Sequence, residues 1–419
     1  MSPGRVPKTV AVLMAAACVV AGHADILGDI VSRCPAQSPS LAETMAHVRA
    51  LQMSPRVTVS PIGASHGGRP LLQITVRDPE VPPEFTVRVF VVARQHGTES
   101  SGTTACLAIA RHFAESEGEL ERALLQQLTW VLVPVANPDG MAAGKRTNGA
   151  GADLNRCWAA ASQPENRAII RAVEQVRPHA VIDMHELPAQ SSKAAYRGNF
   201  IQTIGPSSGL TASLGRECRS ASVRLASWMG QVGYPLNVYY DTAGEDTKLC
   251  HRYFGLARKI PSYLFEAKTG GGRSLASRTR FQVLGALVVA DSALHCHYEP
   301  PAEGPQMAST PLPAPVVEAA PEGPPVVEVA LPRDRETARG ELSVVATATP
   351  PQALAYLQLR VDGVLKALGS SATQTFPLNT RAYADGEHRI VVEACDDCGR
   401  VLAEAAVTVL VDNQQEAGE

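Results

Sequence analysis

The stretch "VVARQHGTESSGTT" runs from Val91 to Thr104 and decides how the long first part of the chain is interpreted. An apolar run stops at His96, and Glu99 follows three residues later. The apolar run predicts a buried strand, and the small polar residues after it predict a turn leading into a helix. The same His-x-x-Glu spacing recurs at His112 and Glu115. Spacing alone therefore does not distinguish a metal-binding pair from an ordinary polar turn.

Strand and helix patterns alternate from about Asp25 to Tyr298. The predicted strands are "FTVRVFVVARQ", "LTWVLVPVANPDG", "HAVIDMHE" and "IPSYLFEA", and helical patterns lie at residues 102–115 and in "ENRAIIRAVEQV". This alternation predicts an α/β domain with a largely parallel sheet. Ligands of such sheets bind beyond the carboxyl ends of the strands. Polar residues at these strand ends are therefore the first candidates for a functional site.

Three of the predicted strands end in residue types that bind metals. His96 and Glu99 follow the first strand, His185 lies at the end of a later one, and Glu266 ends the last. Two histidines and one glutamate form a common zinc set that leaves one position for water or substrate. His112 lies well inside its predicted helix, away from any strand end, so we expect a packing or surface histidine there.

The ordered blocks resemble those of the zinc carboxypeptidase family, the carboxypeptidase A-like metallopeptidases. The resemblance covers about residues 61–291, and its blocks read "PIGASHGGRPLLQI", "HGTE", "NPDG" followed by "KRTNGAGADLNRCW", "DMH" and "LFEAKTGGG". The resemblance implies a mixed, largely parallel eight-stranded sheet with helices on both faces. It also implies one Zn²⁺ ion per catalytic domain and hydrolysis of the C-terminal peptide bond of peptides.

The resemblance also implies the roles of the metal-site residues. His96, Glu99 and His185 would bind zinc, and Asp153 would accept a hydrogen bond from the His96 ring and so fix its tautomer. Glu266 would take a proton from the attacking water and later give it to the leaving amine.

Substrate contacts follow from the same resemblance. Arg146 would stabilise the oxyanion, and Asn155 with Arg156 would bind the free C-terminal carboxylate, for which the planar guanidinium is suited. The resemblance also implies a mobile tyrosine that closes over the substrate. Tyr240 is assigned this role because it precedes a stretch of small residues, and the adjacent Tyr239 is the alternative.

Preference for a substrate side chain is left open by the sequence. Lys248 and Arg252 would favour an acidic C-terminal residue, unless they pair with Glu245 or Asp246 instead.

The chain changes character after residue 298. Residues 299–325 are rich in Pro, Ala and Glu, which predicts a semi-rigid linker. Residues 326–413 alternate apolar and polar residues and include a hairpin signal at Asp362-Gly363, so they predict a small all-β sandwich that resembles bacterial Ig-like modules. Its partner could be another protein or the cell surface. Residues 414–419 form a tail. The spacing of Cys395 and Cys398 predicts either a small turn disulfide or two free thiols.

The N-terminus has the pattern of a signal peptide spanning residues 1–24. Arg5 and Lys8 precede the short apolar run "VAVLMAAACVVAG", and Ala24 ends a plausible cleavage site. The pattern predicts export to the periplasm or beyond the cell, with a catalytic domain at residues 25–298. An uncleaved anchor and lipidation of Cys18 are the alternatives. The eight cysteines that would remain can form disulfides in an exported protein.

Composition limits the remaining function classes. The 419 residues carry a net charge of -3 with 45% hydrophobic and 19% charged residues, which is typical of a soluble protein and gives no basic surface for nucleic acid. One rival interpretation is a zinc amidase acting on peptidoglycan peptides or N-acyl amino acids, similar to aspartoacylase. Another is a secreted binding protein with an inactive peptidase domain. The block "NPDG" and the spacing of Arg146 before "DLNR" favour the peptidase over the amidase, and the presence of all the expected zinc and catalytic groups argues against an inactive domain.

Overall fold

The computed structural model of the chain describes residues 24–34, 37–188, 198–205, 212–231, 236–241, 244–270, 273–297, 325–350, 354–396 and 399–413. The predicted signal peptide, nearly all of the predicted linker, Cys398 and the tail lie outside these residues.

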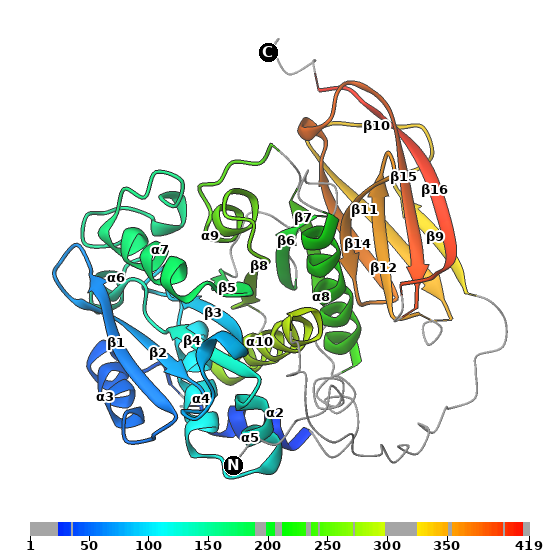
Figure 1. Ribbon diagram of the computed structural model, residues 1–419. Helices are drawn as coiled ribbons and strands as arrows, with labels where there is room; N and C mark the ends of the chain where they lie inside the picture. Colours follow the sequence, from blue (N-terminus) through cyan, green and yellow to red (C-terminus); the bar gives the residue numbers. More distant parts are fainter. Residues whose placement is uncertain are drawn as a thin grey trace.

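The first part of the described chain is built on a mixed eight-stranded sheet (Figure 1). Its order is β1-β2-β4-β3-β5-β8-β6-β7. Strands β3, β4, β5 and β8 run parallel, whereas β2 and β6 run antiparallel to their neighbours β4 and β8. The bounds are β1 Val57–Ala64, β2 Pro70–Val76, β3 Val87–Ala93, β4 Leu128–Val133, β5 Ala180–Leu187, β6 Asn199–Ile204, β7 Leu236–Asp241 and β8 Ser262–Lys268. The predicted fold class is confirmed for this part.

Helices cover both faces of this sheet, as Figure 1 shows. One face packs against α4, α8 and α10, and the other against α7 and α9. The helices are α2 Ala24–Ser32, α3 Leu41–Leu51, α4 Ser101–Glu115, α5 Glu119–Leu125, α6 Pro138–Ala143, α7 Pro164–Val176, α8 Ala212–Gln231, α9 Cys250–Arg252 and α10 Leu275–His297, with a short 3₁₀ turn at Leu154–Arg156. The inner strands are nearly continuous apolar runs because both of their faces are buried.

Alternation along the strands directs the candidate site residues to one face. Met184 and Phe265 pack into the core on the α10 side. Their neighbours His185 and Glu266 therefore point to the α7–α9 side, because successive side chains of a strand alternate between faces. His185 and Glu266 are also partners in the register of β5 and β8, so their side chains lie next to each other.

The C-terminal part is a β-sandwich. One sheet has the order β13-β12-β15-β16-β10 and the other β14-β11-β9. Asp362 and Gly363 both have positive φ, 50° and 78°, in a two-residue turn between Val361 and Val364, which confirms the hairpin prediction. The bounds are β9 Val326–Leu331, β10 Glu336–Ala338, β11 Glu341–Thr349, β12 Tyr356–Val361, β13 Val364–Gly369, β14 Thr373–Asn379, β15 Gly386–Cys395 and β16 Val401–Val411.

The two parts are joined by main-chain pairing. Strand β13 of the sandwich pairs antiparallel with β7, so the larger sheet continues from the α/β part into the sandwich. In Figure 1 the sandwich, in orange and red, lies directly beside α8 and β7.

The cysteines of the described residues do not form disulfides. All seven are free thiols, and Cys106, Cys218 and Cys250 lie fully buried in separate parts of the fold. The expectation of disulfides is therefore wrong for these residues, since most of the thiols serve as small core side chains. Within the described chain, none of the helices is both long and apolar enough to cross a membrane.

Candidate active site

The turn after β3 is held by the neighbouring segment around α6. Glu99 donates its backbone N–H to the carbonyl of His96 at 3.0 Å, which closes the turn. Gly97 lies so close to Gly140 that an added Cβ would be 2.1 Å from its carbonyl carbon. Asn137 caps α6 and donates its side-chain amide to the carbonyl of Gln95 at 3.0 Å. The blocks "HGTE" and "NPDG" thus form one packed unit.

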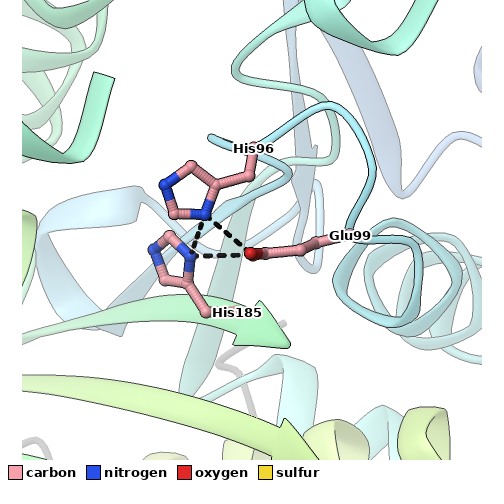
Figure 2. Close-up of side chains that lie close together, drawn as sticks. All are labelled: His96, Glu99 and His185. Carbon is pink, nitrogen blue, oxygen red and sulfur yellow. Dashed lines mark hydrogen bonds and ion pairs between the residues drawn. The ribbon is translucent and has the colours of Figure 1, made fainter. Parts of the chain in front are cut away.

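The side chains of His96, Glu99 and His185 converge on one point (Figure 2). The two imidazoles direct their Nδ1 atoms at each other, 3.1 Å apart. The carboxylate lies 2.7 Å from Nδ1 of His96 and 2.8 Å from Nδ1 of His185. All three residues are buried, with exposed fractions of 3%, 7% and 1% in chain order.

A second carboxylate lies behind each imidazole. Asp153 Oδ1 is 3.1 Å from Nε2 of His96, and Asp183 Oδ1 is 3.0 Å from Nε2 of His185. Gln95 donates to the same oxygen of Asp183 at 2.5 Å. These contacts occupy the outer nitrogen of each ring and leave Nδ1 to face the cluster.

Charges within the cluster shift the pKa values of Glu99 and His185. Burial raises the pKa of Glu99, but the charges of His185 and His96 outweigh it and lower the value to about 2. Burial lowers the pKa of His185, but the carboxylates of Asp183 and Glu99 outweigh it and hold the pKa well above its usual range. The negative charge of Glu99 and the positive charge of His185 therefore stabilise each other in the buried site.

Glu266 differs from the other carboxylates of the site. Its Oε2 is buried and accepts no hydrogen bond from any residue that the structure describes. Burial is the main cause that raises its pKa to about 8, and the nearby carboxylates of Glu99 and Asp183 add to the rise. Glu266 is thus poised to hold a proton near neutral pH, beside His185 in the adjoining strand.

The cluster fits a zinc ion. Two imidazole nitrogens and a carboxylate oxygen are the donors that zinc takes in hydrolytic sites. Ligand atoms bonded to one tetrahedral zinc ion at about 2.0–2.1 Å lie about 3.3 Å apart, close to the separations seen here. The outer carboxylates match the partners that orient zinc-binding histidines. The unpartnered oxygen of Glu266 adds a proton acceptor beside His185 of this cluster.

Arg146 reaches the cluster from the side. Its guanidinium lies 3.1 Å from Oδ2 of Asp153 and 3.6 Å from Oε1 of Glu99, and the side chain is half exposed. Asn155 lies deeper, with Nδ2 3.2 Å from Nε2 of His185, and its Oδ1 accepts the backbone N–H of Cys250 at 2.8 Å. Arg156 is exposed and donates to the carbonyl of Asn155 at 2.8 Å.

Comparison with known proteins matches each of the two parts of the chain to a family model. Residues 43–179 match the family model described as zinc carboxypeptidase, and residues 325–392 match the one described as bacterial Ig domain. The chain carries a zinc carboxypeptidase domain. A bacterial Ig domain follows it. The match to the zinc carboxypeptidase model contains His96 and Glu99 and ends before His185 and Glu266.

Relatives of known structure share the fold of the zinc carboxypeptidase domain. The metallo-carboxypeptidase from Burkholderia cenocepacia is 24% identical with a TM-score of 0.50, over 60% of this chain and 67% of that one. Carboxypeptidase A from Helicoverpa armigera is 19% identical with a TM-score of 0.51, over 69% and 80%. Carboxypeptidase 2 of Trichophyton tonsurans is 28% identical over 110 residues, 26% of this chain and 20% of that protein. The chain thus spans about a fifth of the length of the curated relatives it matches.

Tyr240 is not brought to the site of the zinc carboxypeptidase domain. Its side chain is buried in the core on the α8–α10 side, the face of the sheet opposite His185 and Glu266. Tyr239 points to the site face, where its ring packs on Phe200 with centroids 5.5 Å apart. The prediction relied on the small residues that follow, whereas strand alternation decides which of two adjacent tyrosines faces the site.

The cations expected to select an acidic substrate are paired within the domain. Arg252 lies 2.8 Å from Asp241 and 3.0 Å from Glu245, and Lys248 lies 3.6 Å from Asp246. The pairs with Glu245 and Asp246 correspond to the alternative that the sequence left open, whereas the pair of Arg252 with Asp241 was not predicted.

The second His-x-x-Glu pair has a structural role. His112 is buried in α4, with Nδ1 2.8 Å from Asp29 of α2, and Glu115 is 2.5 Å from Arg33. Both residues attach α2 to the domain.

Asp183 is the site residue that the sequence interpretation missed. It lies two residues before His185, so both side chains share one face of β5. A carboxylate two positions before a candidate ligand in a fully buried strand was the signal that could have identified it.

Proposed function

We propose that the chain is an exported zinc metallocarboxypeptidase that removes C-terminal residues from peptides. The observation that carries the proposal is the register of β5 and β8, which sets Glu266, with its unpartnered oxygen, beside His185 of the His–Glu–His cluster. The family match and the choice of donors support zinc as the metal. When bound, zinc would act as a Lewis acid and lower the pKa of a coordinated water toward about 7.

The residues of the chain would divide the remaining chemistry. Glu266 would accept the proton of the attacking water and deliver it to the leaving amine, a role supported by its unpartnered oxygen and its place beside His185. Arg146, beside the cluster, would stabilise the negative charge that develops on the carbonyl oxygen. Arg156 is exposed and would bind the substrate carboxylate, with Asn155 beside it.

Substitution of Glu266 tests the proton-transfer role. The variant Glu266→Gln should retain one zinc per chain and lose at least about 10²-fold in kcat, the range assigned to general acid–base groups. The matched control is Glu174→Gln, an exposed carboxylate paired with Arg258 on the outer side of α7. Zinc content by atomic emission and turnover of a short peptide are the two measurements. Near-normal turnover by Glu266→Gln would exclude this role.

Substitution of Arg156 tests the position of cleavage. Arg156→Ala should reduce kcat/KM for peptides with a free C-terminus and leave the slow cleavage of C-terminally amidated peptides unchanged. Equal losses on both substrates would contradict binding of the terminal carboxylate.

Rival substrates need a separate experiment. The zinc-loaded protein is incubated with a mixed pool of peptides, muropeptides and N-acyl amino acids, and the products are read by mass spectrometry. Loss of single C-terminal residues supports the proposal, whereas release of peptidoglycan peptides or acyl groups supports the amidase. A pool left unchanged supports the inactive binding protein.

Export is the remaining part of the proposal and rests on residues 1–24 of the sequence. N-terminal sequencing of protein recovered outside the cytoplasm should begin at Asp25. Recovery of the full-length chain from the cytoplasm would contradict it.

A further inference from the structure

Strand β7 is the last strand of the zinc carboxypeptidase sheet, and it is not left open. An edge strand presents a row of unpaired backbone N–H and C=O groups. Here β13 of the Ig domain lies against that edge, pairing Asn237 with Gly369, Val238 with Leu368 and Tyr239 with Ala367. The main chain itself therefore connects the two domains.

Polar contacts extend this pairing at its ends. Ser370 accepts the backbone N–H of Leu236 at its hydroxyl, 2.9 Å away, and donates its own N–H to the Leu236 carbonyl at 3.1 Å. The side-chain amide of Gln374 donates to the side-chain oxygen of Asn237. These bonds fix the register of β7 against the Ig domain.

The apolar core crosses the same boundary. Leu368 is fully buried and belongs to the same core as Val238 of β7 and Leu225 of α8. Helix α8 also contacts β12 and β13. Side chains of the Ig domain that take part in this shared core are Tyr356, Leu365, Leu368 and Cys395. A domain that moved freely on a tether would leave these side chains exposed to water.

Contacts from the Ig domain lead toward the candidate site. Tyr239 packs against the Ig core on one side and against the ring of Phe200 on the other. Phe200 is the register partner of Glu266 on the neighbouring strand β8. A row of packed side chains therefore runs across β7 and β6 to the strand that carries Glu266.

We propose that the Ig domain is docked permanently on the β7 edge of the zinc carboxypeptidase domain and acts as its in-chain structural partner, supporting β7 and β6 beside Glu266. The proposal concerns the joint between the domains and does not depend on the reaction that the site performs.

Cleavage of the linker tests whether the joint holds by itself. A specific protease site is inserted in residues 299–325 of the full chain, and the folded protein is cut without denaturant. The two fragments should elute together in size-exclusion chromatography at micromolar concentration. Elution as two separate species would overturn the proposal.

A pair of variants locates the joint. Leu368→Asp places a charge in the shared core, so its cut fragments should separate. The matched control is Leu410→Asp on β16, an exposed leucine that lies outside the shared core, and its fragments should stay together. Co-elution of the Leu368→Asp fragments would show that the assigned surface is wrong.

Hydrogen exchange of the intact wild type provides a check without substitutions. Amides of Leu236–Asp241 should exchange as slowly as those of the inner strand β5 and more slowly than those of β1, which ends the sheet on its other side. Exchange of β7 as fast as that of β1 would contradict permanent docking.

Discussion

Two carboxylates, one behind each imidazole, orient the rings of the His96–Glu99–His185 cluster. Asp153 was expected from the resemblance, whereas Asp183 was identified only when the strand placed it beside His185. The three residues of the cluster could be predicted from the sequence because each follows or ends a buried apolar run. The choice between Tyr239 and Tyr240 failed because adjacent residues of a strand face opposite ways, and that face cannot be read from the small residues that follow.

Asp183→Asn should weaken zinc binding by about 10–100-fold, because the loss of an oriented carboxylate partner lowers the basicity of the ligand imidazole. Competition with a chelator at fixed pH measures the affinity. Asp291→Asn is the control, since Asp291 is an equally buried carboxylate paired with Arg224 away from the cluster. Unchanged affinity for Asp183→Asn would remove this residue from the site.

The raised pKa of Glu266 predicts a pH dependence of stability in the metal-free protein. Below the unfolded-state pKa of about 4.5 the group is protonated in both states, so it carries no penalty. As pH rises toward the folded-state value of about 8, the unfolded chain loses the proton first, and the free energy of unfolding falls. Because glutamine cannot ionise, Glu266→Gln should be more stable than wild type by about 1–3 kcal/mol at pH 8.5 and nearly equal at pH 4.5.

Urea unfolding of both metal-free proteins at the two pH values measures this difference. If the two proteins differ in free energy of unfolding by the same amount at both pH values, Glu266 does not have a raised pKa in the folded state.

The turn after β3 places His96 and Glu99, whereas strands β5 and β8 place His185 and Glu266. The sequence predicted the alternating strands and helices correctly, since periodicity and apolar runs carry that information. It gave no sign of how closely "HGTE" packs on "NPDG", because the approach of Gly97 to Gly140 is a tertiary contact. The packing histidine expected at His112 is confirmed, but its partners could not be predicted because Asp29 of α2 and Glu121 of α5 are tertiary contacts.

Gly97→Ala should distort this packed turn, because its Cβ would overlap the backbone of Gly140. We expect a loss of more than about 2 kcal/mol in the free energy of unfolding, together with weaker zinc binding. Gly28→Ala is the control, since Gly28 is an exposed position of α2 with no atom within 4 Å of the added Cβ, and alanine should gain up to about 1 kcal/mol there.

Chemical denaturation of both variants measures the free energy of unfolding, and zinc titration measures the affinity for zinc. If Gly97→Ala is as stable as wild type, the segments "HGTE" and "NPDG" can move apart without loss of free energy of unfolding.

At the scale of the whole molecule, the sequence indicated two domains and a linker, and both domain types are confirmed. The two domains do not form separate structural units, since the sheet and the core continue from one into the other. Strand pairing between distant segments is invisible to local patterns, so β7–β13 could not have been predicted from either strand alone.

A shared core predicts joint unfolding. Calorimetry of the intact chain should give a single cooperative transition, because loss of the Ig domain would expose the apolar side chains of β7 and α8. Two well-separated transitions would indicate that each domain keeps its structure without the other.

The covered edge of β7 has a practical consequence for anyone who trims this protein. A shortened chain ending near residue 298 would retain every candidate site residue and appear to be a minimal enzyme, yet it would expose a bare, apolar strand edge. Such edges recruit other chains and promote aggregation during expression. Poor yield of that fragment would then reflect a missing cover for one strand, and would say nothing against the choice of site residues.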